Sequence, residues 1–371
     1  MLISAEDANR AQRVLVINVT RIGDTLLATP AIRAIAAFFP NADVTVLGSA
    51  KRVEVLENIA YISKVGSVSK HTAWMRGWKD RLTETEYDYA FVWGQDAALV
   101  EYALRKARHV IAEKQSDAAL NHGLALAYAA PVQNSVHAVA WFLGMVQAAG
   151  IPLQGYGLDY TVTSAERKFA AERMFGALGA SNHLPTVGFQ VASFHTKAWR
   201  DWPIQRFIDL GLRMVQNYPD VRFICFGAPE DQARIAELER TLRGRVLSFA
   251  GKTTLRESAA LMSLLDLYVG IDTGPTHLYS ALKKPMVVLY HPSIPSALYK
   301  PLEHPALAAI DHPLAGPTCR DHLPMNEIGV ETVWRAVERM LEKDSSEWPG
   351  MPSPGIDADV APWPGDALPY K

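Results

Sequence analysis

The stretch VLVINVTRIGDTLLATPAIRAIAAFF, residues 14–39, decides the fold class of this chain. It begins with the apolar run Val14–Asn18, which is typical of a strand buried on both faces of a parallel sheet. A turn follows at residues 20–24, and apolar side chains then recur at helical spacing until Pro40 and Asn41 end the pattern. A buried strand, a turn and a helix in this order predict the start of a βαβ unit.

The same alternation of strands and helices continues along most of the chain. Further strands are predicted at residues 43–47, 62–65, 87–93 and 109–111, and helices near residues 72–83, 96–107 and 136–149. A second series of predicted strands lies at residues 186–190, 221–226, 246–249, 267–271 and 286–290. The helices expected in that half lie at residues 164–178, 204–217, 230–242, 254–264, 275–282 and 331–343. The pattern predicts two doubly wound, Rossmann-like α/β domains.

Breaks in the alternation mark the domain boundaries. We expect an N-terminal domain at residues 1–150, a linker region at 151–184 and a C-terminal domain at 185–343. Residues 344–371 form a tail with six prolines, which is neither a regular helix nor a central strand. Two such domains facing each other predict a ligand cleft, with the functional motifs at the carboxyl ends of the strands.

Composition excludes several classes of protein. The 371 residues carry a net charge of −2, with 49% hydrophobic and 20% charged residues, so the chain is globular and lacks the basic excess of a nucleic-acid-binding protein. Two distant cysteines, Cys225 and Cys319, form neither a zinc-ligand set nor a disulfide framework, which favours a reducing compartment. The N-terminus lacks the apolar core of a signal peptide, and no stretch approaches the ~18 apolar residues of a membrane span. We therefore expect a cytoplasmic protein, which would have to visit the membrane from the cytoplasmic side if its substrate were a lipid.

The turn after the first strand carries a candidate catalytic carboxylate. Gly23 and Asp24 are expected in this turn, where a side chain reaches the cleft. Asp24 is a candidate general base, because a sugar hydroxyl is a poor nucleophile until its proton is removed. The alternative is that Asp24 only caps the following helix. Arg21 either binds an anionic acceptor and keeps Asp24 ionised, or is a solvated turn residue.

The motif IDTGPTHL, residues 271–278, predicts a diphosphate site. Asp272 falls at the carboxyl end of a strand, Gly274 lets the backbone approach a ligand, and Pro275 suits the first helical turn. The helix that begins there offers N–H groups and a partial positive charge to a phosphate.

Three side chains of the same motif add to this prediction. Thr273 and Thr276 can donate hydroxyl hydrogen bonds, and His277 can add positive charge beside the diphosphate. The alternative for His277 is a structural role inside the domain.

A third motif, SFHTKAWRDWP at residues 193–203, offers Thr196, Lys197 and Arg200 after the first strand of the second domain. Fixed cations and hydroxyls stabilise the charge of a departing diphosphate without a metal. The alternative is a charged surface loop.

The fourth motif, FGAPED at residues 226–231, follows the next strand. Glu230 or Asp231 can bind ribose hydroxyls, as acidic residues do in other nucleotide-binding folds. The alternative is a helix cap.

Together these segments resemble glycosyltransferase family 9, the ADP-heptose:lipopolysaccharide heptosyltransferases. The family pattern I-G-D-x-x-x-x-T-P-x-x-R stands here as IGDTLLATPAIR, and D-[ST]-G-x-x-H-x-x-x-A-x-x-x-P stands as DTGPTHLYSALKKP. A K-x-W-P-like loop stands as KAWRDWP. The resemblance implies the GT-B fold, an inverting mechanism, no metal and no cofactor. It also implies transfer of heptose from ADP-heptose to an inner-core lipopolysaccharide acceptor.

Carried over by position, the resemblance assigns roles to individual residues. Asp24 is then the catalytic base, and Glu230 or Asp231 holds the ribose. The diphosphate is held by Thr196, Lys197 or Arg200 together with Asp272, Thr273, Gly274 and His277. Two departures stand out: Arg200 occupies a position where members often carry lysine, and only Cys319 is present where several members have more cysteines, so we predict no iron or other metal.

The acceptor side is predicted from basic residues in the first domain. Residues 51–81 are rich in lysine and arginine, and we expect Arg21, Gly23, Arg52 and Arg76 to contact the acceptor. Trp74, Trp78 and Leu82 are spaced as one face of a helix. This stripe either meets an anionic lipid surface or an acidic sugar core, or packs against its own domain.

The resemblance thus implies an inverting, metal-independent glycosyltransferase, which we expect in the cytoplasm with peripheral contact at the inner membrane's cytoplasmic face. Two alternatives stay open: a sugar-nucleotide epimerase or hydrolase of the same fold, and a non-catalytic nucleotide-sugar-binding protein. The epimerase or hydrolase needs no separate acceptor, which distinguishes it by product analysis.

Overall fold

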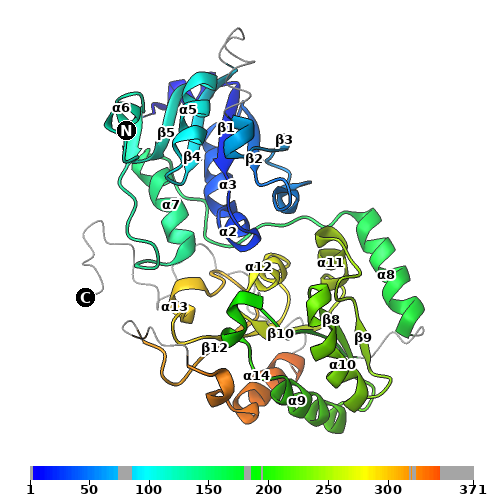
Figure 1. Ribbon diagram of the computed structural model, residues 1–371. Helices are drawn as coiled ribbons and strands as arrows, with labels where there is room; N and C mark the ends of the chain where they lie inside the picture. The colour runs from blue at the N-terminus through cyan, green and yellow to red at the C-terminus, as the bar shows by residue number, and fades with distance from the viewer. Residues whose placement is uncertain are drawn as a thin grey trace. The chain divides into compact units, whose positions relative to one another are not determined.

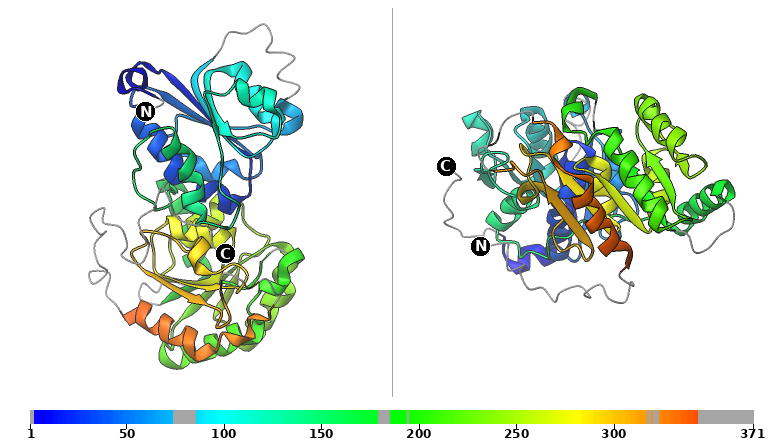
Figure 2. Two further views of the ribbon diagram at one scale, coloured as in Figure 1. Left: turned by 90° about the vertical axis from the view of Figure 1, so that its left-hand side faces the viewer. Right: turned by 90° about the horizontal axis from the view of Figure 1, so that it is seen from below.

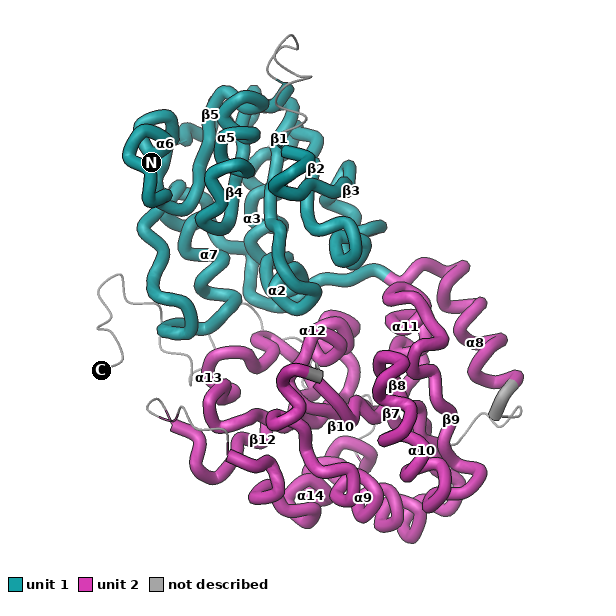
Figure 3. Tube along the Cα trace, viewed as in Figure 1, with its two compact units in different colours: residues 1–161 teal, residues 162–371 magenta. Residues whose placement is uncertain are grey.

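The computed structural model divides into two compact units, residues 1–161 and residues 162–371 (Figure 3). It describes residues 3–73, 86–178, 185–193, 195–316, 319 and 323–342. The division falls inside the expected linker region, and the helix α8 (Ser164–Leu178) belongs to the second unit. Each unit is built on its own sheet.

Six parallel strands form the sheet of unit 1 in the order β3-β2-β1-β4-β5-β6. The strands are β1 (Arg13–Asn18), β2 (Asp43–Gly48), β3 (Lys64–Ser67), β4 (Tyr87–Trp93), β5 (Ala107–Glu113) and β6 (Leu126–Tyr128). The helices are α1 (Ala5–Arg10), α2 (Ile22–Leu27), α3 (Thr29–Phe38), η1 (Val53–Leu56), α5 (Ala97–Lys106), α6 (Ala118–His122) and α7 (Ala138–Ala148). The crossovers place helices on both faces of the sheet (Figures 1 and 2).

The apolar run that opens this unit is buried on both faces, as predicted. Val14–Ile17 are all 0% exposed. Leu15 and Ile17 join a cluster with Leu99 and Val100 of α5, and intervening residues of the strand face the opposite side of the sheet.

The helix after β1 differs from the prediction in one functional respect. Two helices, α2 and α3, replace one continuous helix; they meet at Ala28, and Pro30 lies in the first turn of α3. Because α2 already begins at Ile22, Gly23 and Asp24 lie in its first turn rather than in the preceding loop. The turn that carries Gly23 and Asp24 still comes shortly after the carboxyl end of β1.

Unit 2 repeats the same topology. Its parallel strands follow the order β12-β11-β10-β7-β8-β9, which matches the order of unit 1 when strands are counted from β7. They are β7 (Thr186–Gln190), β8 (Arg222–Phe226), β9 (Val246–Ser248), β10 (Leu267–Ile271), β11 (Met286–Tyr290) and β12 (Leu307–Asp311). Besides α8, its helices are η3 (His195–Arg200), α9 (Ile204–Asn217), η4 (Pro229–Asp231), α10 (Gln232–Thr241), α11 (Leu255–Met262), α12 (Gly274–Ala281), α13 (Ser296–Tyr299), η5 (Met325–Glu327) and α14 (Val330–Glu342). Strand order reverses between β7 and β10.

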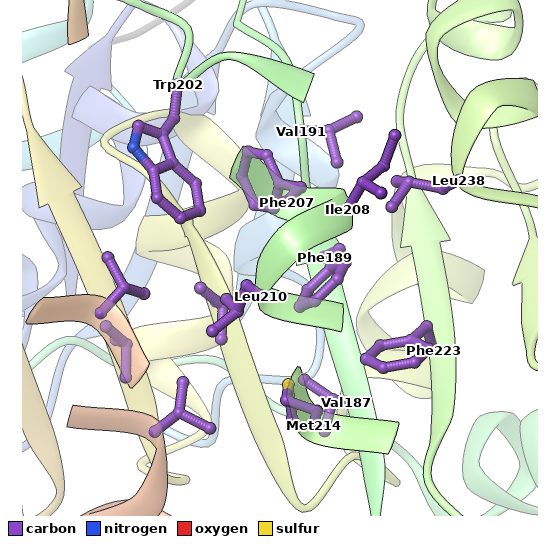
Figure 4. Packing of buried hydrophobic residues seen from close by; sticks show 14 of the residues in the cluster. Val187, Phe189, Val191, Trp202, Phe207, Ile208, Leu210, Met214, Phe223 and Leu238 are labelled. Carbon is purple, nitrogen blue, oxygen red and sulfur yellow. The ribbon is translucent and has the colours of Figure 1, made fainter. Parts of the chain in front are cut away.

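Aromatic and branched side chains fill the core between this sheet and the helices on one face. Phe189 of β7 lies 5.4 Å from Phe207 of α9 and 4.9 Å from Phe223 of β8, measured between ring centroids (Figure 4). Trp202 is fully buried and donates from Nε1 to the Ile328 carbonyl oxygen at 2.9 Å, so its polar atom is satisfied. This packing fixes the end of the loop that follows β7.

The opposite face of the second sheet is also covered. Tyr268 of β10 stacks on Tyr279 of α12, with 4.7 Å between the ring centroids. Burial raises the pKa of both phenols, so they stay neutral. The strand that ends in the second functional motif is therefore held from both sides.

The fold class is confirmed, and the two strands that the sequence analysis missed are edge strands. β6 and β12 each pair with one neighbour and are half-exposed along much of their length, so they lack a continuous apolar run. The predicted helix at 72–83 lies largely, and the tail at 344–371 entirely, outside the described residues. Of the helices that are described, none combines the length and the apolar character needed to cross a bilayer.

Candidate functional site

Unit 1 presents its candidate residues at the carboxyl ends of β1 and β2. The two strands are parallel neighbours, with Asn18 opposite Gly48, so the loops that follow them leave from the same edge of the sheet. The first loop leads through Arg21 to Asp24 in α2, and the second carries Arg52 in front of η1.

Asp24 lies half-buried in the first turn of α2. Thr20 Oγ1 donates to Asp24 Oδ2 at 3.1 Å, and this is the one hydrogen bond to the carboxylate within the described residues. The helix N-terminus favours a negative charge at this position. The N-cap is Arg21, so the alternative in which Asp24 serves as the cap is wrong. An oriented, accessible carboxylate of this kind can accept a proton from a bound hydroxyl.

Three of the other acceptor candidates, Arg21, Gly23 and Arg52, lie near this carboxylate in the chain or through a hydrogen bond. Arg52 Nη1 donates to the carbonyl oxygen of Thr20 at 3.2 Å, so Thr20 links Arg52 to Asp24. Arg21 is exposed and Gly23 is half-buried. Thr20 was missed by the sequence analysis, although a hydroxyl one helical turn before a carboxylate is a readable signal. Arg76, Trp74, Trp78 and Leu82 lie outside the described residues.

In unit 2, two of the predicted motifs meet where the strand order reverses. β7 and β10 are parallel neighbours, with Gln190 opposite Gly270, and the loop 193–203 and the turn 272–273 follow their carboxyl ends. This is the position at which open α/β sheets bind ligands.

Arg200 and Asp272 join these two motifs directly. Arg200 Nη2 donates to Asp272 Oδ2 and to the Asp272 carbonyl oxygen, both at 2.9 Å. The two side chains are 11% and 7% exposed. His277 Nε2 lies 3.4 Å from Asp272 Oδ1 on the other side of the carboxylate. Asp272 therefore lies between two nitrogen groups, and its described hydrogen bonds orient Arg200.

This cluster retains hydrogen-bonding capacity. Arg200 Nε, Asp272 Oδ1 and His277 Nδ1 are buried and have no hydrogen-bond partner among the described residues. A carboxylate repels a diphosphate, so the geometry favours Asp272 as the residue that holds Arg200, and favours the two nitrogen groups for contact with the anion. Arg200 and Asp272 are 72 residues apart, so their ion pair could not be predicted from the two motifs considered separately.

The turn between β10 and α12 contains two threonines that differ in burial, and both hydroxyls donate to the Ile271 carbonyl oxygen. Thr273 is the half-buried N-cap of α12, and Gly274 and Pro275 occupy its first turn, as predicted. Thr276 is 0% exposed, and its hydroxyl donates to the Ile271 carbonyl oxygen at 2.6 Å. Thr276 thus supports the turn from inside instead of facing a ligand, which differs from its predicted role.

The loop after β7 is held by a carboxylate that the sequence analysis missed. Asp201 accepts from the Ser193 backbone N–H at 2.7 Å and from Arg234 of α10 at 2.5 Å. Within the loop, Thr196 is exposed and Lys197 is half-buried. The start of the loop is therefore fixed by Asp201, and Thr196 lies exposed at the loop's surface.

The two ribose candidates differ in environment. Asp231 Oδ2 accepts from the Ala228 backbone N–H at 2.8 Å and so caps its own turn. A Cβ at Gly227 would lie 2.7 Å from the same oxygen, so a larger residue there would displace the Asp231 side chain. Burial raises the pKa of Asp231. Glu230 is exposed and has no hydrogen bond or ion pair with the described residues, so the geometry favours Glu230 for a ligand.

Comparison with known proteins is consistent with this geometry. The family model for glycosyltransferase family 9 (heptosyltransferase) matches residues 75–320, more than half of the chain. The chain belongs to glycosyltransferase family 9. This assignment makes it a glycosyltransferase and agrees with the resemblance of its motifs.

Individual relatives are distant but extend over most of the chain. The chain is similar to the lipopolysaccharide core heptosyltransferase OpsX of Haemophilus influenzae, at 22% identity over 78% of this chain and 82% of the relative. Its fold matches a family 9 glycosyltransferase of Veillonella parvula with a TM-score of 0.76, at 18% identity, covering 89% of this chain and 97% of that one. It also matches E. coli ADP-heptose lipopolysaccharide heptosyltransferase II with a TM-score of 0.71, at 18% identity, covering 89% and 98% of the two chains. These structures show the GT-B fold.

Proposed function

We propose that this protein transfers heptose from ADP-heptose to a sugar hydroxyl of a lipopolysaccharide inner-core glycolipid or related glycan, with inversion and without a metal or cofactor. The names of its relatives, which act in lipopolysaccharide core synthesis, support the donor and the acceptor class. A glycolipid acceptor would be met by peripheral contact at the cytoplasmic face of the inner membrane.

One observation carries the proposal: the Arg200–Asp272–His277 cluster at the start of α12. Arg200 is hydrogen-bonded to the Asp272 carboxylate, and His277 lies 3.4 Å from its other oxygen, beside a helix N-terminus whose partial positive charge favours an anion. As the glycosidic bond breaks, negative charge develops on the diphosphate, and prearranged cations and N–H groups stabilise it. The diphosphate needs no bound metal if these groups neutralise it.

In the proposed reaction, Asp24 removes the proton from the acceptor hydroxyl. The hydroxyl oxygen forms a bond to the anomeric carbon as the bond from that carbon to the diphosphate oxygen breaks, and ADP leaves with the electron pair. A single displacement of this kind inverts the anomeric configuration. Thr20 orients the carboxylate, and Arg21 and Arg52 bind an anionic acceptor nearby.

The remaining donor contacts come from the loops around the cluster. Thr196 and Lys197 of the first loop, and Thr273 and Gly274 at the helix start, bind the diphosphate, while Glu230 binds the ribose. Thr276 and Asp231 support these turns from behind.

The test is a transfer assay with ADP-, UDP- and GDP-sugars and a heptose-deficient inner-core glycolipid, run in the presence of EDTA. We expect mass spectrometry to show addition of one heptose from ADP-heptose only, with the same rate with and without EDTA. A requirement for added Mg²⁺ or Mn²⁺ would overturn the metal-independent mechanism.

Incubation with donor alone separates the alternatives. Consumption of the donor without an acceptor would indicate an epimerase or a hydrolase. Tight donor binding by calorimetry, with no transfer to any core glycolipid, would indicate a binding protein.

Replacing Glu230 with glutamine is expected to raise the Kd for ADP about tenfold. The exposed carboxylate would lose charge-assisted hydrogen bonds to the ribose, worth about 1.5–3 kcal/mol. The matched control is Asp231→Ala, which removes a turn cap worth about 1 kcal/mol. We expect this control to lower the melting temperature while the Kd stays within about twofold. Titration calorimetry with ADP measures the Kd, and scanning calorimetry measures the melting temperature. A larger rise of the Kd in Asp231→Ala than in Glu230→Gln would assign the ribose contact to Asp231.

A further inference from the structure

The segment by which the chain leaves unit 1 is fixed to the helices next to Asp24. Arg33 of α3 donates from Nε to the Gln154 carbonyl oxygen and from Nη1 to the Gly157 carbonyl oxygen, each at 3.1 Å, and pairs with the Asp159 carboxylate. One guanidinium thus binds three points of a six-residue stretch. The Arg33 and Asp159 side chains are only 22% and 23% exposed.

Two further residues complete this attachment. Tyr61 donates its hydroxyl hydrogen bond to Asp159 Oδ2 at 2.7 Å, and the Asp159 backbone N–H donates to Thr29 Oγ1 at 3.0 Å. Thr29 in turn donates to the Leu26 carbonyl oxygen in the last turn of α2, at 2.7 Å. Burial and the neighbouring carboxylate raise the pKa of Tyr61, so its hydroxyl stays protonated and donates. We call Thr29, Arg33, Tyr61 and Asp159 the exit clamp.

The exit clamp uses the same sequence motif as the candidate base. IGDTLLATPAIR contains Asp24, Thr29 and Arg33, and α2 and α3 carry all three. Asp24 lies in the first turn of α2, which follows the carboxyl end of β1, while Thr29 and Arg33 hold the exit segment. The motif therefore connects the position of the base to the point at which the chain leaves its unit.

A matching anchor lies on the other side of the division. Arg256 of α11 contacts Glu166 of α8 with its Nε at 2.5 Å and its Nη2 at 2.9 Å, and the Thr163 backbone N–H donates to Glu166 Oε2 at 2.8 Å. The hydrogen bond from Arg256 is the main cause that lowers the pKa of Glu166 to about 2. Each unit thus holds its own end of the crossing, at Asp159 and at Thr163.

We infer that the exit clamp is a positioning device for transfer: by fixing the chain's exit relative to Asp24, it sets the register in which the base meets a donor held by unit 2. We assign positioning roles to Arg33, Tyr61, Thr29 and Asp159, because their described hydrogen bonds join the exit segment to the helices of unit 1. The inference rests on the proposed function. A misplacement of about 1 Å between reacting groups can lower a rate about 10²-fold, so small losses of register have large effects.

The test compares Arg33→Met, Asp159→Ala and the double variant with Arg33→Lys, which keeps the charge but cannot bind three acceptors at once. We expect kcat to fall at least tenfold in each single Met or Ala variant, with little further loss in the double variant. We expect the kcat of Arg33→Lys to lie between the kcat of these variants and that of wild type. The Kd for ADP should stay within about twofold, because every proposed donor contact lies in unit 2. Arg213→Met, which removes another ion-paired arginine, from unit 2, is the control with unchanged kcat.

A second readout does not depend on activity. Spin labels at Glu101→Cys and Arg240→Cys, both exposed positions, report the distance between the units in a Cys319→Ser background, since Cys225 is fully buried. The clamp variants should broaden the distance distribution of the ligand-free protein, and Arg213→Met should not. A kcat within twofold of wild type, or an unchanged distribution, would overturn the inference whatever the melting temperature does. If wild type transfers no heptose, the proposed function fails. The exit clamp is then tested by the distance distribution alone.

Discussion

Replacing Asp24 with asparagine is expected to lower kcat by about 10²–10⁴-fold, the usual contribution of a general base. Asparagine keeps the size of the side chain and can still accept the hydrogen bond from Thr20, so the first turn of α2 should be preserved. It cannot take the proton of the acceptor hydroxyl. Steady-state transfer of heptose measures kcat, and calorimetry measures the Kd for ADP, which we expect to stay within about twofold because the proposed donor contacts lie in unit 2.

Thr20→Val is the graded control for this experiment. It removes the one described hydrogen bond to the carboxylate and leaves the charge, so we expect a loss of kcat of no more than about tenfold. An Asp24→Asn protein that keeps more than a hundredth of wild-type turnover would remove Asp24 from the role of base.

Replacing Arg200 with methionine is expected to lower kcat/KM by about 10²–10³-fold, as for the loss of one group that stabilises developing negative charge. It should also lower stability by about 3–5 kcal/mol, because Asp272, 7% exposed, would be left as a buried carboxylate without its arginine. Thermal unfolding and transfer kinetics measure the two effects separately.

The double variant Arg200→Met/Asp272→Asn distinguishes binding from folding. Removal of both charges should restore most of the stability, because no unpaired charge remains buried. Activity should stay low, since the cation for the diphosphate is still missing. A double variant that regains activity together with stability would show that Arg200 serves the fold and not the donor.

Much of the fold follows from apolar runs that are buried on both faces. Central strands such as β1 and β10 have this signal because helices cover both sides of them, whereas the edge strand β12 is half-exposed and lacks it. The break between α2 and α3 was missed because the apolar spacing continues through Ala28. Asp24 lies in the helix for a separate reason, because α2 begins at Ile22 and not after the motif turn.

The candidate site was predictable in position but not in pairing. Motifs at the carboxyl ends of strands identify which residues gather at one edge, because the edge is set by the topology. The partners Arg200–Asp272 and Arg33–Asp159 are separated by 72 and 126 residues, and no local pattern carries such contacts. Likewise, Thr276 and Thr273 look alike in sequence, and only the turn of α12 makes one inward and the other half-buried.

The anchors at Asp159 and Thr163 lie on opposite sides of the Thr161–Val162 junction, and each is made entirely within its own unit. A chimera joined at that junction would cut neither of them and would leave both sheets with their original helices. Under the proposed function, halves taken from different family members should therefore be exchangeable there, which would combine one protein's acceptor contacts with another's donor contacts.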